Sequence, residues 1–151
     1  MNWRLLATGV MICCFIFKPA VAEELNCEAQ KTYKEKGGEE HALNLVVTNN
    51  QITALTYSNV FSDGEEGGDF ACELILKDGT PESEWIRSGK KITIIDKEPG
   101  EESFVEIELP ANGEYKVILN KVSGYHCGFG AVFPESVVLK KSSKKCLING
   151  Q

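Results

Sequence analysis

The sequence predicts an all-β protein: an antiparallel β-sandwich or small open barrel of about eight strands with two disulfides. Three observations favour this fold class. Short runs of apolar and β-branched residues recur along the chain, turn residues separate them, and no stretch after residue 22 keeps a helical period. Parallel strands need crossover helices, so the absence of a helical pattern favours antiparallel pairing.

Eight runs are interpreted as strands because their composition and length are typical of strands. In chain order they span residues 42–48, 52–57, 70–76, 91–95, 104–109, 115–120, 130–133 and 137–140. In the fifth run apolar and acidic residues alternate. Val105, Ile107 and Leu109 therefore share one face, and Phe104, Glu106 and Glu108 lie on the other, as in a half-buried antiparallel strand.

The segments between these runs carry turn chemistry. Asn49-Asn50 follows the first run, and asparagine tolerates the positive φ of a two-residue hairpin loop. Asn112-Gly113 is a pair typical of a tight hairpin. Longer connections, rich in Gly, Asp, Glu, Pro or Ser, are predicted at residues 62–69, 77–84 and 96–103.

The first 22 residues have the organisation of a signal peptide. Arg4 supplies a positive start, residues 5–17 form a mostly apolar run, and Ala20-Val21-Ala22 is a small-x-small cleavage site. The run is shorter than the about 20 residues that a membrane helix needs. We therefore predict cleavage after Ala22, no membrane insertion, a periplasmic or secreted location, and a single β domain over residues 23–151.

The remaining 129 residues are strongly acidic. The leader carries two of the 16 basic residues and none of the 22 acidic ones, so the rest of the chain has a formal charge of −8. Such a charge argues against nucleic acid and anionic membranes as partners. It suits solubility, or a cationic protein partner.

Four cysteines remain after the predicted cleavage. An even number in an exported chain predicts two disulfides; the cysteines are Cys27, Cys72, Cys127 and Cys146. Of three connectivities we favour Cys27–Cys72 with Cys127–Cys146. The second pair brackets what reads as one hairpin, and the first would staple the N-terminal segment to an early strand.

Catalytic and metal motifs are weak. Ser123 and His126 with an acid could form a triad, but there is no Gly-x-Ser-x-Gly elbow and no α/β-hydrolase scaffold. His41 begins a strand and is interpreted as a surface or edge residue. There is no Cys-x-x-Cys, and only His126 lies near a cysteine. We predict no enzyme activity, no metal and no cofactor.

Two charged segments are interpreted as solvated turns. Residues 63–69 hold four carboxylates but lack the ligand spacing of an EF-hand. We expect a solvated acidic loop there. A contact for a basic partner is the second interpretation, and weak calcium binding is the third. Residues 140–145 contain four lysines, which we expect to cap and solubilise a hairpin rather than bind an anion.

Residues 122–133 are the candidate binding loop. Cys127 would anchor the loop, and glycines at 124, 128 and 130 would permit a tight turn. A rigid turn binds well because little entropy is lost on association. The predicted partner-binding residues are Ser123, Gly124, Tyr125 and His126. The alternative is that Phe129 and Val132 belong to the core while the first residues merely face water.

With these features the chain resembles the small periplasmic lysozyme inhibitors of Gram-negative bacteria. Several members carry a Ser-Gly-x-x-Tyr signature in an inhibitory loop. Ser123-Gly124 matches its opening, whereas Tyr125 follows immediately and Cys127 stands where the tyrosine is expected. The resemblance covers size, architecture and export, with two matched residues. It implies a β-domain that inserts this loop into the substrate cleft of a lysozyme.

The expected function is therefore a periplasmic protein-binding module that inhibits a lysozyme or another cell-wall hydrolase by loop insertion. A cationic lysozyme would attract the acidic chain. The same features suit an immunity protein that neutralises a delivered toxin. A small-ligand-binding or structural β-domain is the third alternative.

Overall fold

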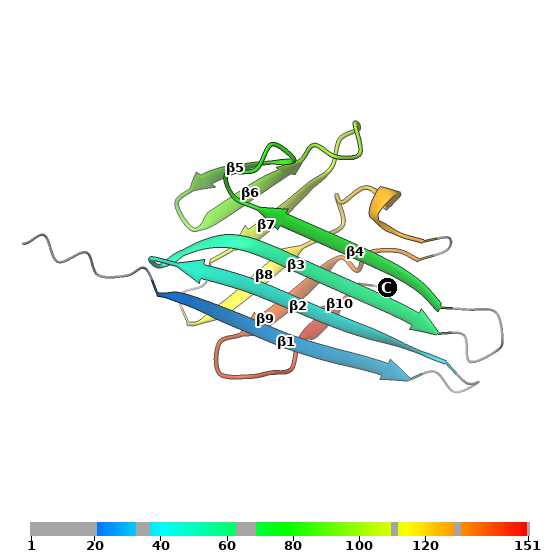
Figure 1. Cartoon of the computed structure of the whole chain (residues 1–151). Coiled ribbons are helices and arrows are strands. Elements are labelled where there is room, and N and C mark those ends of the chain that lie inside the picture. Colours follow the sequence, from blue (N-terminus) through cyan, green and yellow to red (C-terminus); the bar gives the residue numbers. More distant parts are fainter. Residues whose placement is uncertain (1–20, 33–36, 63–68, 110–111, 129–130, 151) are drawn as a thin grey trace, which may run out of the picture.

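The computed structural model describes residues 21–32, 37–62, 69–109, 112–128 and 131–150, and these form two antiparallel sheets (Figure 1). The four-stranded sheet has the order β1 (Ala22–Thr32), β2 (Gly38–Thr48), β3 (Gln51–Ser62), β4 (Asp69–Lys77). The six-stranded sheet has the order β10 (Leu147–Asn149), β9 (Ser136–Lys140), β8 (Glu114–Ile118), β7 (Phe104–Glu108), β6 (Lys91–Asp96), β5 (Ser83–Ser88). The predicted all-β antiparallel fold with two disulfides is confirmed as two open sheets.

Each sheet is a meander in which strands pair with their neighbours in the chain. The predicted loop at Asn49 and Asn50 joins β2 to β3, with φ angles of 52° and 62°. Both values lie in the left-handed region that asparagine tolerates, and Thr48 pairs directly with Gln51. Gly113, in the predicted turn before β8, has a φ of 77°.

One hydrophobic core lies between the sheets and draws side chains from both. Its largest fully buried members include Leu43, Leu45 and Tyr57 from the first sheet. The alternation predicted for β7 is confirmed, because Val105 and Ile107 are fully buried whereas the acidic residues beside them are not. Period-two patterning therefore orients the strands in the sandwich.

The strand predicted over 130–133 is wrong in the part that the structure describes. Residues 131–133 are not in a strand, and they precede Pro134. Their backbone turns toward the four-stranded sheet, where the Val132 carbonyl accepts a hydrogen bond from Asn59 Nδ2 at 3.4 Å. Strands β1, β5 and β10 had not been predicted, since each is either rich in charged residues or very short.

The predicted disulfide pairing is also wrong: the bonds are Cys27–Cys146 and Cys72–Cys127. Cys27 and Cys72 lie on β1 and β4, the two edges of one sheet. Three strand spacings separate these edges by about 14 Å, too far for a disulfide, whose Cα atoms lie within about 7 Å. Each bond instead joins one edge of the four-stranded sheet to a connecting segment of the other sheet.

The predicted signal peptide lies mostly outside the described residues, since the description begins at residue 21. Within the described part, no helix has the length and apolar character needed to cross a membrane. Two disulfides indicate folding in an oxidising compartment.

Candidate functional site: the turn between β8 and β9

A short 3₁₀ helix, η1 (Gly124–His126), occupies the connection between β8 and β9. Ser123 is its N-cap, and the serine Oγ accepts a hydrogen bond from the Tyr125 backbone N–H at 3.1 Å. The Cys127 N–H closes the turn on the Gly124 carbonyl at 3.0 Å. Serine is favoured at this position because its side chain satisfies an otherwise free amide of the first turn.

The carboxylate of Asp96 holds this turn against the end of β6. Asp96 is only 2% exposed, and its Oδ2 accepts hydrogen bonds from Ser103 Oγ at 2.9 Å and from His126 Nε2 at 2.7 Å. The Glu98 N–H donates to Oδ1 at 3.2 Å. A buried carboxylate needs such donors. Asp96 therefore connects β6, the loop after it and η1.

Ser123 belongs to the same network and is 7% exposed. Its backbone N–H donates to Ser103 Oγ at 3.1 Å, and its hydroxyl donates to Glu101 Oε1. The ring nitrogen Nε2 of His126 is directed at Asp96. The described contacts thus pair Ser123 and His126 with two different carboxylates, which is not the relay of a serine hydrolase.

A disulfide anchors the far end of the turn to the other sheet. Cys127 is bonded to Cys72 on β4, and the Gly128 N–H donates to the Ala71 carbonyl at 2.7 Å. A Cβ on Gly128 would meet Ala71 backbone atoms at ordinary contact distance. Gly124 has open space around it and no positive φ, so the turn does not depend on glycine there. Gly130 and Phe129 lie outside the described residues.

Tyr125 projects from the turn and is 61% exposed. Of the aromatic side chains that the structure describes, it is the only exposed one. Its ring stands edge-on to the His126 ring, at 89° with centroids 5.3 Å apart. Since Asp96 holds His126, the tyrosine ring rests on a fixed support.

The loop that is hydrogen-bonded to this turn is acidic. Glu98, Glu101 and Glu102 are exposed on the loop between β6 and β7. The hydrogen bonds of His126 to Asp96 and of Ser123 to Glu101 bring this loop against the turn. We call Tyr125 with these three glutamates the Tyr125 surface. It combines an exposed aromatic ring with exposed carboxylates on the adjoining loop.

The four predicted binding residues are thus brought together, but with different exposure. Tyr125 and Gly124 face solvent, whereas Ser123 is buried and the His126 side chain is 9% exposed. The sequence did not indicate Asp96, Ser103 and Glu101, which hold the turn. Their hydrogen bonds to His126 and Ser123 span 20 to 30 positions of the chain. No local sequence pattern connects residues so far apart.

One set of side chains has the donor chemistry for a metal ion. A ligand atom from each of Asp96, Glu98 and His126 lies within 4.8 Å of the others. The chain spacing of these residues gave no sign of this arrangement, because strand pairing alone brings residues 96–98 beside residue 126.

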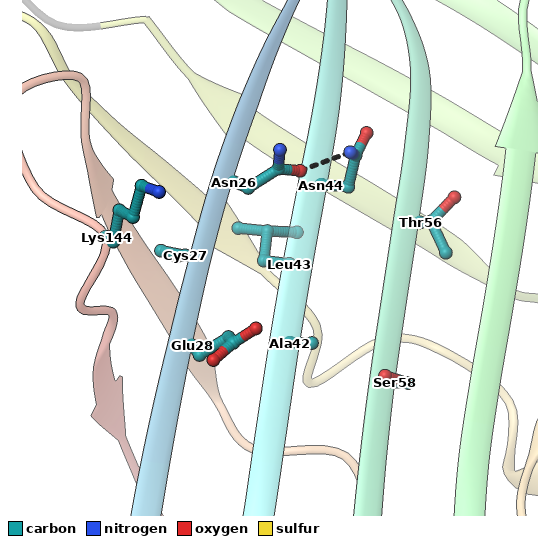
Figure 2. Close-up of a pocket in the computed structure, with 9 residues that line it drawn as sticks. All are labelled: Asn26, Cys27, Glu28, Ala42, Leu43, Asn44, Thr56, Ser58 and Lys144. Atoms are coloured by element: carbon teal, nitrogen blue, oxygen red, sulfur yellow. Dashed lines mark hydrogen bonds between the residues drawn. The ribbon is translucent and has the colours of Figure 1, made fainter.

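A groove of about 480 Å³ lies on the face of the four-stranded sheet that points away from the core (Figure 2). Its polar lining residues come from β1, β2, β3 and the segment before β10, and they are Asn26, Glu28, Asn44, Thr56, Ser58 and Lys144. Asn44 Nδ2 donates to Asn26 Oδ1 across the paired strands. Cys27, Ala42 and Leu43 complete the lining, so the groove has both polar and apolar walls.

His41 was expected at the surface or an edge, and that expectation is wrong. It is 3% exposed, with Nδ1 2.8 Å from the Tyr57 hydroxyl and Nε2 3.2 Å from Glu39 Oε2. Burial lowers the pKa of His41, which the hydrogen bond to Glu39 partly offsets. Burial likewise raises the pKa of Tyr57. This polar cluster is internal to the sandwich.

Of the two charged segments, residues 63–69 and 140–145, the structure describes mainly the second. The acidic loop at 63–69 lies outside the described residues except for the backbone of its last member. In the basic turn, Lys140 pairs with Glu114 and Lys141 with Glu23. Both pairs join the turn to neighbouring strands, Lys140 to the start of β8 and Lys141 to β1.

The chain has no match among protein-family models, curated proteins or solved structures. The features of the described residues that bear on function are the turn, the Tyr125 surface and the groove.

Proposed function

We propose that the protein is an exported, non-enzymatic protein-binding module that recognises its partner through the Tyr125 surface. The partner is a cationic protein of the cell envelope, with a lysozyme or another cell-wall hydrolase as the first candidate. One observation carries this proposal: an exposed tyrosine stands on a turn that a cap, a buried carboxylate and a disulfide all hold in place.

Rigidity of the turn favours binding because ordering a loop on association lowers affinity. The buried Asp96 pairs with His126 on one side of Tyr125, and Cys127 is bonded to β4 on the other. Tyrosine is enriched among the residues that dominate interface energies, since its ring has a large area and few torsions to restrict. A fixed tyrosine on a turn that is hydrogen-bonded to an acidic loop is therefore a suitable anchor.

The charge of the surface supports a cationic partner. Glu98, Glu101 and Glu102 are exposed on the loop that is hydrogen-bonded to the turn, and the chain after residue 22 carries a formal charge of −8. Complementary charge accelerates encounter and excludes partners of like charge. Cell-wall hydrolases that act on anionic envelopes are typically basic, which fits the first candidate.

In this proposal the predicted binding residues have two roles. Tyr125 and Gly124 contact the partner, because they are exposed. Ser123 and His126 act as positioning residues, because their polar atoms are bonded to Glu101 and Asp96. Periplasmic or secreted localisation accords with the two disulfides.

An immunity protein against a delivered toxin would use the same surface and belongs to the same binding class. The groove on the four-stranded sheet favours a different second candidate, a domain that binds a small hydrophilic ligand. Amides, hydroxyls, a carboxylate and an ammonium group line it, which suits a hydroxyl-rich compound such as a sugar.

Co-purification with a panel of basic lysozymes and envelope-targeting toxins tests the proposal. Tyr125→Ala should weaken binding by at least about 2 kcal/mol, or roughly 30-fold in Kd, because it removes the anchor. Tyr125→Phe should retain most of the affinity. Leu147→Ala removes a side chain of similar exposure on β10, 55% against 61% for Tyr125, and should leave the affinity unchanged.

The outcomes separate the candidates. Binding to a hydrolase or toxin that Tyr125→Ala weakens and Leu147→Ala does not supports the proposed surface. Absence of binding to every panel member would sink the protein-binding class. Equal affinities of wild type and Tyr125→Ala would move the interface elsewhere. Tight binding of a saccharide that Asn44→Ala abolishes would favour the groove instead.

A further inference from the structure

We infer that Asp96, Glu98 and His126 form a binding site for a divalent transition-metal ion, with Zn²⁺ as the expected occupant. One ligand atom of each side chain lies within 4.8 Å of the ligand atoms of the other two. The inference goes beyond partner binding, and it holds or fails independently of it.

The donor set selects the class of metal. An imidazole nitrogen with two carboxylates suits Zn²⁺, which binds three protein ligands and a water in many sites. Ca²⁺ prefers six to eight oxygen ligands, and Mg²⁺ prefers an octahedron of oxygens. The two carboxylates would neutralise the charge of the ion, so burial of Asp96 next to it would not leave uncompensated charge.

The ligand atoms would have to shift to accept the ion. Two ligands on a tetrahedral zinc are about 3.3 Å apart, given bonds of about 2.0 Å. His126 Nε2 and Asp96 Oδ2 are 2.7 Å apart, so they would separate slightly as the ion replaces the shared proton. Glu98 is exposed, so its carboxylate is free to rotate toward the ion.

Outer hydrogen bonds already orient the ligands. Ser103 Oγ donates to Asp96 Oδ2 at 2.9 Å, and the Glu98 N–H donates to Oδ1 at 3.2 Å. Such partners hold a metal-binding carboxylate in its rotamer and raise affinity. The edge-on ring of Tyr125 restricts His126 on its other side.

Competing ligands are few in the described part of the chain. All four of its cysteines are in disulfides, so they offer no thiolate. His41 is buried and bonded to Tyr57 and Glu39. Of the two described imidazoles, that of His126 is the less buried, with 9% of its side chain exposed against 1% for His41.

Isothermal titration with Zn²⁺ tests the site, using tag-free protein expressed from its full 151-residue coding sequence with both disulfides formed. We expect one Zn²⁺ per chain and weaker binding of Ca²⁺ and Mg²⁺. Glu98→Gln and His126→Gln should each raise the Kd for Zn²⁺ by at least about tenfold, since losing even an outer-shell partner has effects of that size.

Glu102→Gln is the matched control, because it removes the same charge from the same loop outside the cluster and should leave the Kd unchanged. Glu98→Gln changes an exposed side chain and keeps the test valid if His126→Gln disturbs folding. Zn²⁺ binding that all three variants share would place the ion elsewhere and overturn the site. So would the absence of Zn²⁺ binding in the millimolar range.

Discussion

At the scale of single residues, His41 shows how burial changes the chemistry of a side chain. A carboxylate can only accept, so His41 Nε2 donates to Glu39, and Nδ1 of the neutral ring accepts from the Tyr57 hydroxyl. The raised pKa of Tyr57 keeps its proton available for this bond. The neutral imidazole is thus the form that the sandwich accommodates.

The lowered pKa of His41 predicts a loss of stability in acid. Above pH 6.5 the ring is neutral in both states, and stability is unaffected. As pH falls below 6.5 toward the lower folded pKa, the unfolded state binds a proton first and the free energy of unfolding decreases. Urea unfolding at pH values above and below this window measures the decrease.

His41→Gln supplies the control for this prediction. Glutamine keeps an amide that can bond to Tyr57 but takes up no proton. The free energy of unfolding of this variant should fall less between the two pH values than that of the wild type. An equal fall in both proteins would mean that other groups, and not His41, carry the acid sensitivity.

At the scale of elements, local chemistry was predictable and long-range pairing was not. Asn49 and Asn50 form the expected two-residue turn because the preference for positive φ resides in those residues. The buried face of β7 was predicted correctly because the alternation of apolar and acidic residues lies within the strand itself. The strand β1 was missed because only Leu25 and Cys27 of its eleven residues are buried apolar residues.

In the candidate site too, the local turn was predictable and its long-range contacts were not. The sequence identified the turn at 123–126 as a feature, and the structure places the four residues together. It could not identify Asp96, because that carboxylate reaches His126 only through the pairing of β6, β7 and β8. The prediction of the disulfide pairing was wrong for the same reason, because the pairing depends on which strands become sheet edges.

The two disulfides should differ in their effect on function. Removing Cys72–Cys127 as a double serine variant should lower stability by about 4 kcal/mol, and removing Cys27–Cys146 by about 5 kcal/mol, because the second closes a longer loop. Only the first anchors the turn. Loss of Cys72–Cys127 should therefore weaken partner binding more, although it destabilises the protein less.

Denaturant unfolding and affinity measurements on both double variants, at a temperature where each is folded, test this prediction. The expected result is an inverse order of stability loss and affinity loss. If affinity follows stability in the two variants, the disulfide next to η1 has no special role in holding Tyr125.

At the scale of the whole molecule, charge should govern how fast a partner arrives. The association rate with a cationic partner should fall by roughly tenfold or more as salt rises from low to several hundred millimolar, because the Debye length shortens. Glu102→Gln should reduce the rate and its salt dependence slightly. Tyr125→Ala should act mainly on dissociation.

Surface plasmon resonance at several salt concentrations separates these effects. A rate that does not respond to salt would argue against a cationic partner, whatever the affinity. A change in association rate with Tyr125→Ala as large as that with the charge variant would argue against an anchoring role for the tyrosine.

The arrangement of the two disulfides also bears on survival among proteases. The Cys72–Cys127 bond lies, along the chain, inside the segment closed by Cys27–Cys146. A single peptide bond cut anywhere between residues 27 and 146 therefore leaves two fragments that stay covalently joined. Such a cut in an exposed loop would nick the molecule without releasing either sheet, so the nicked protein would separate into fragments only after reduction.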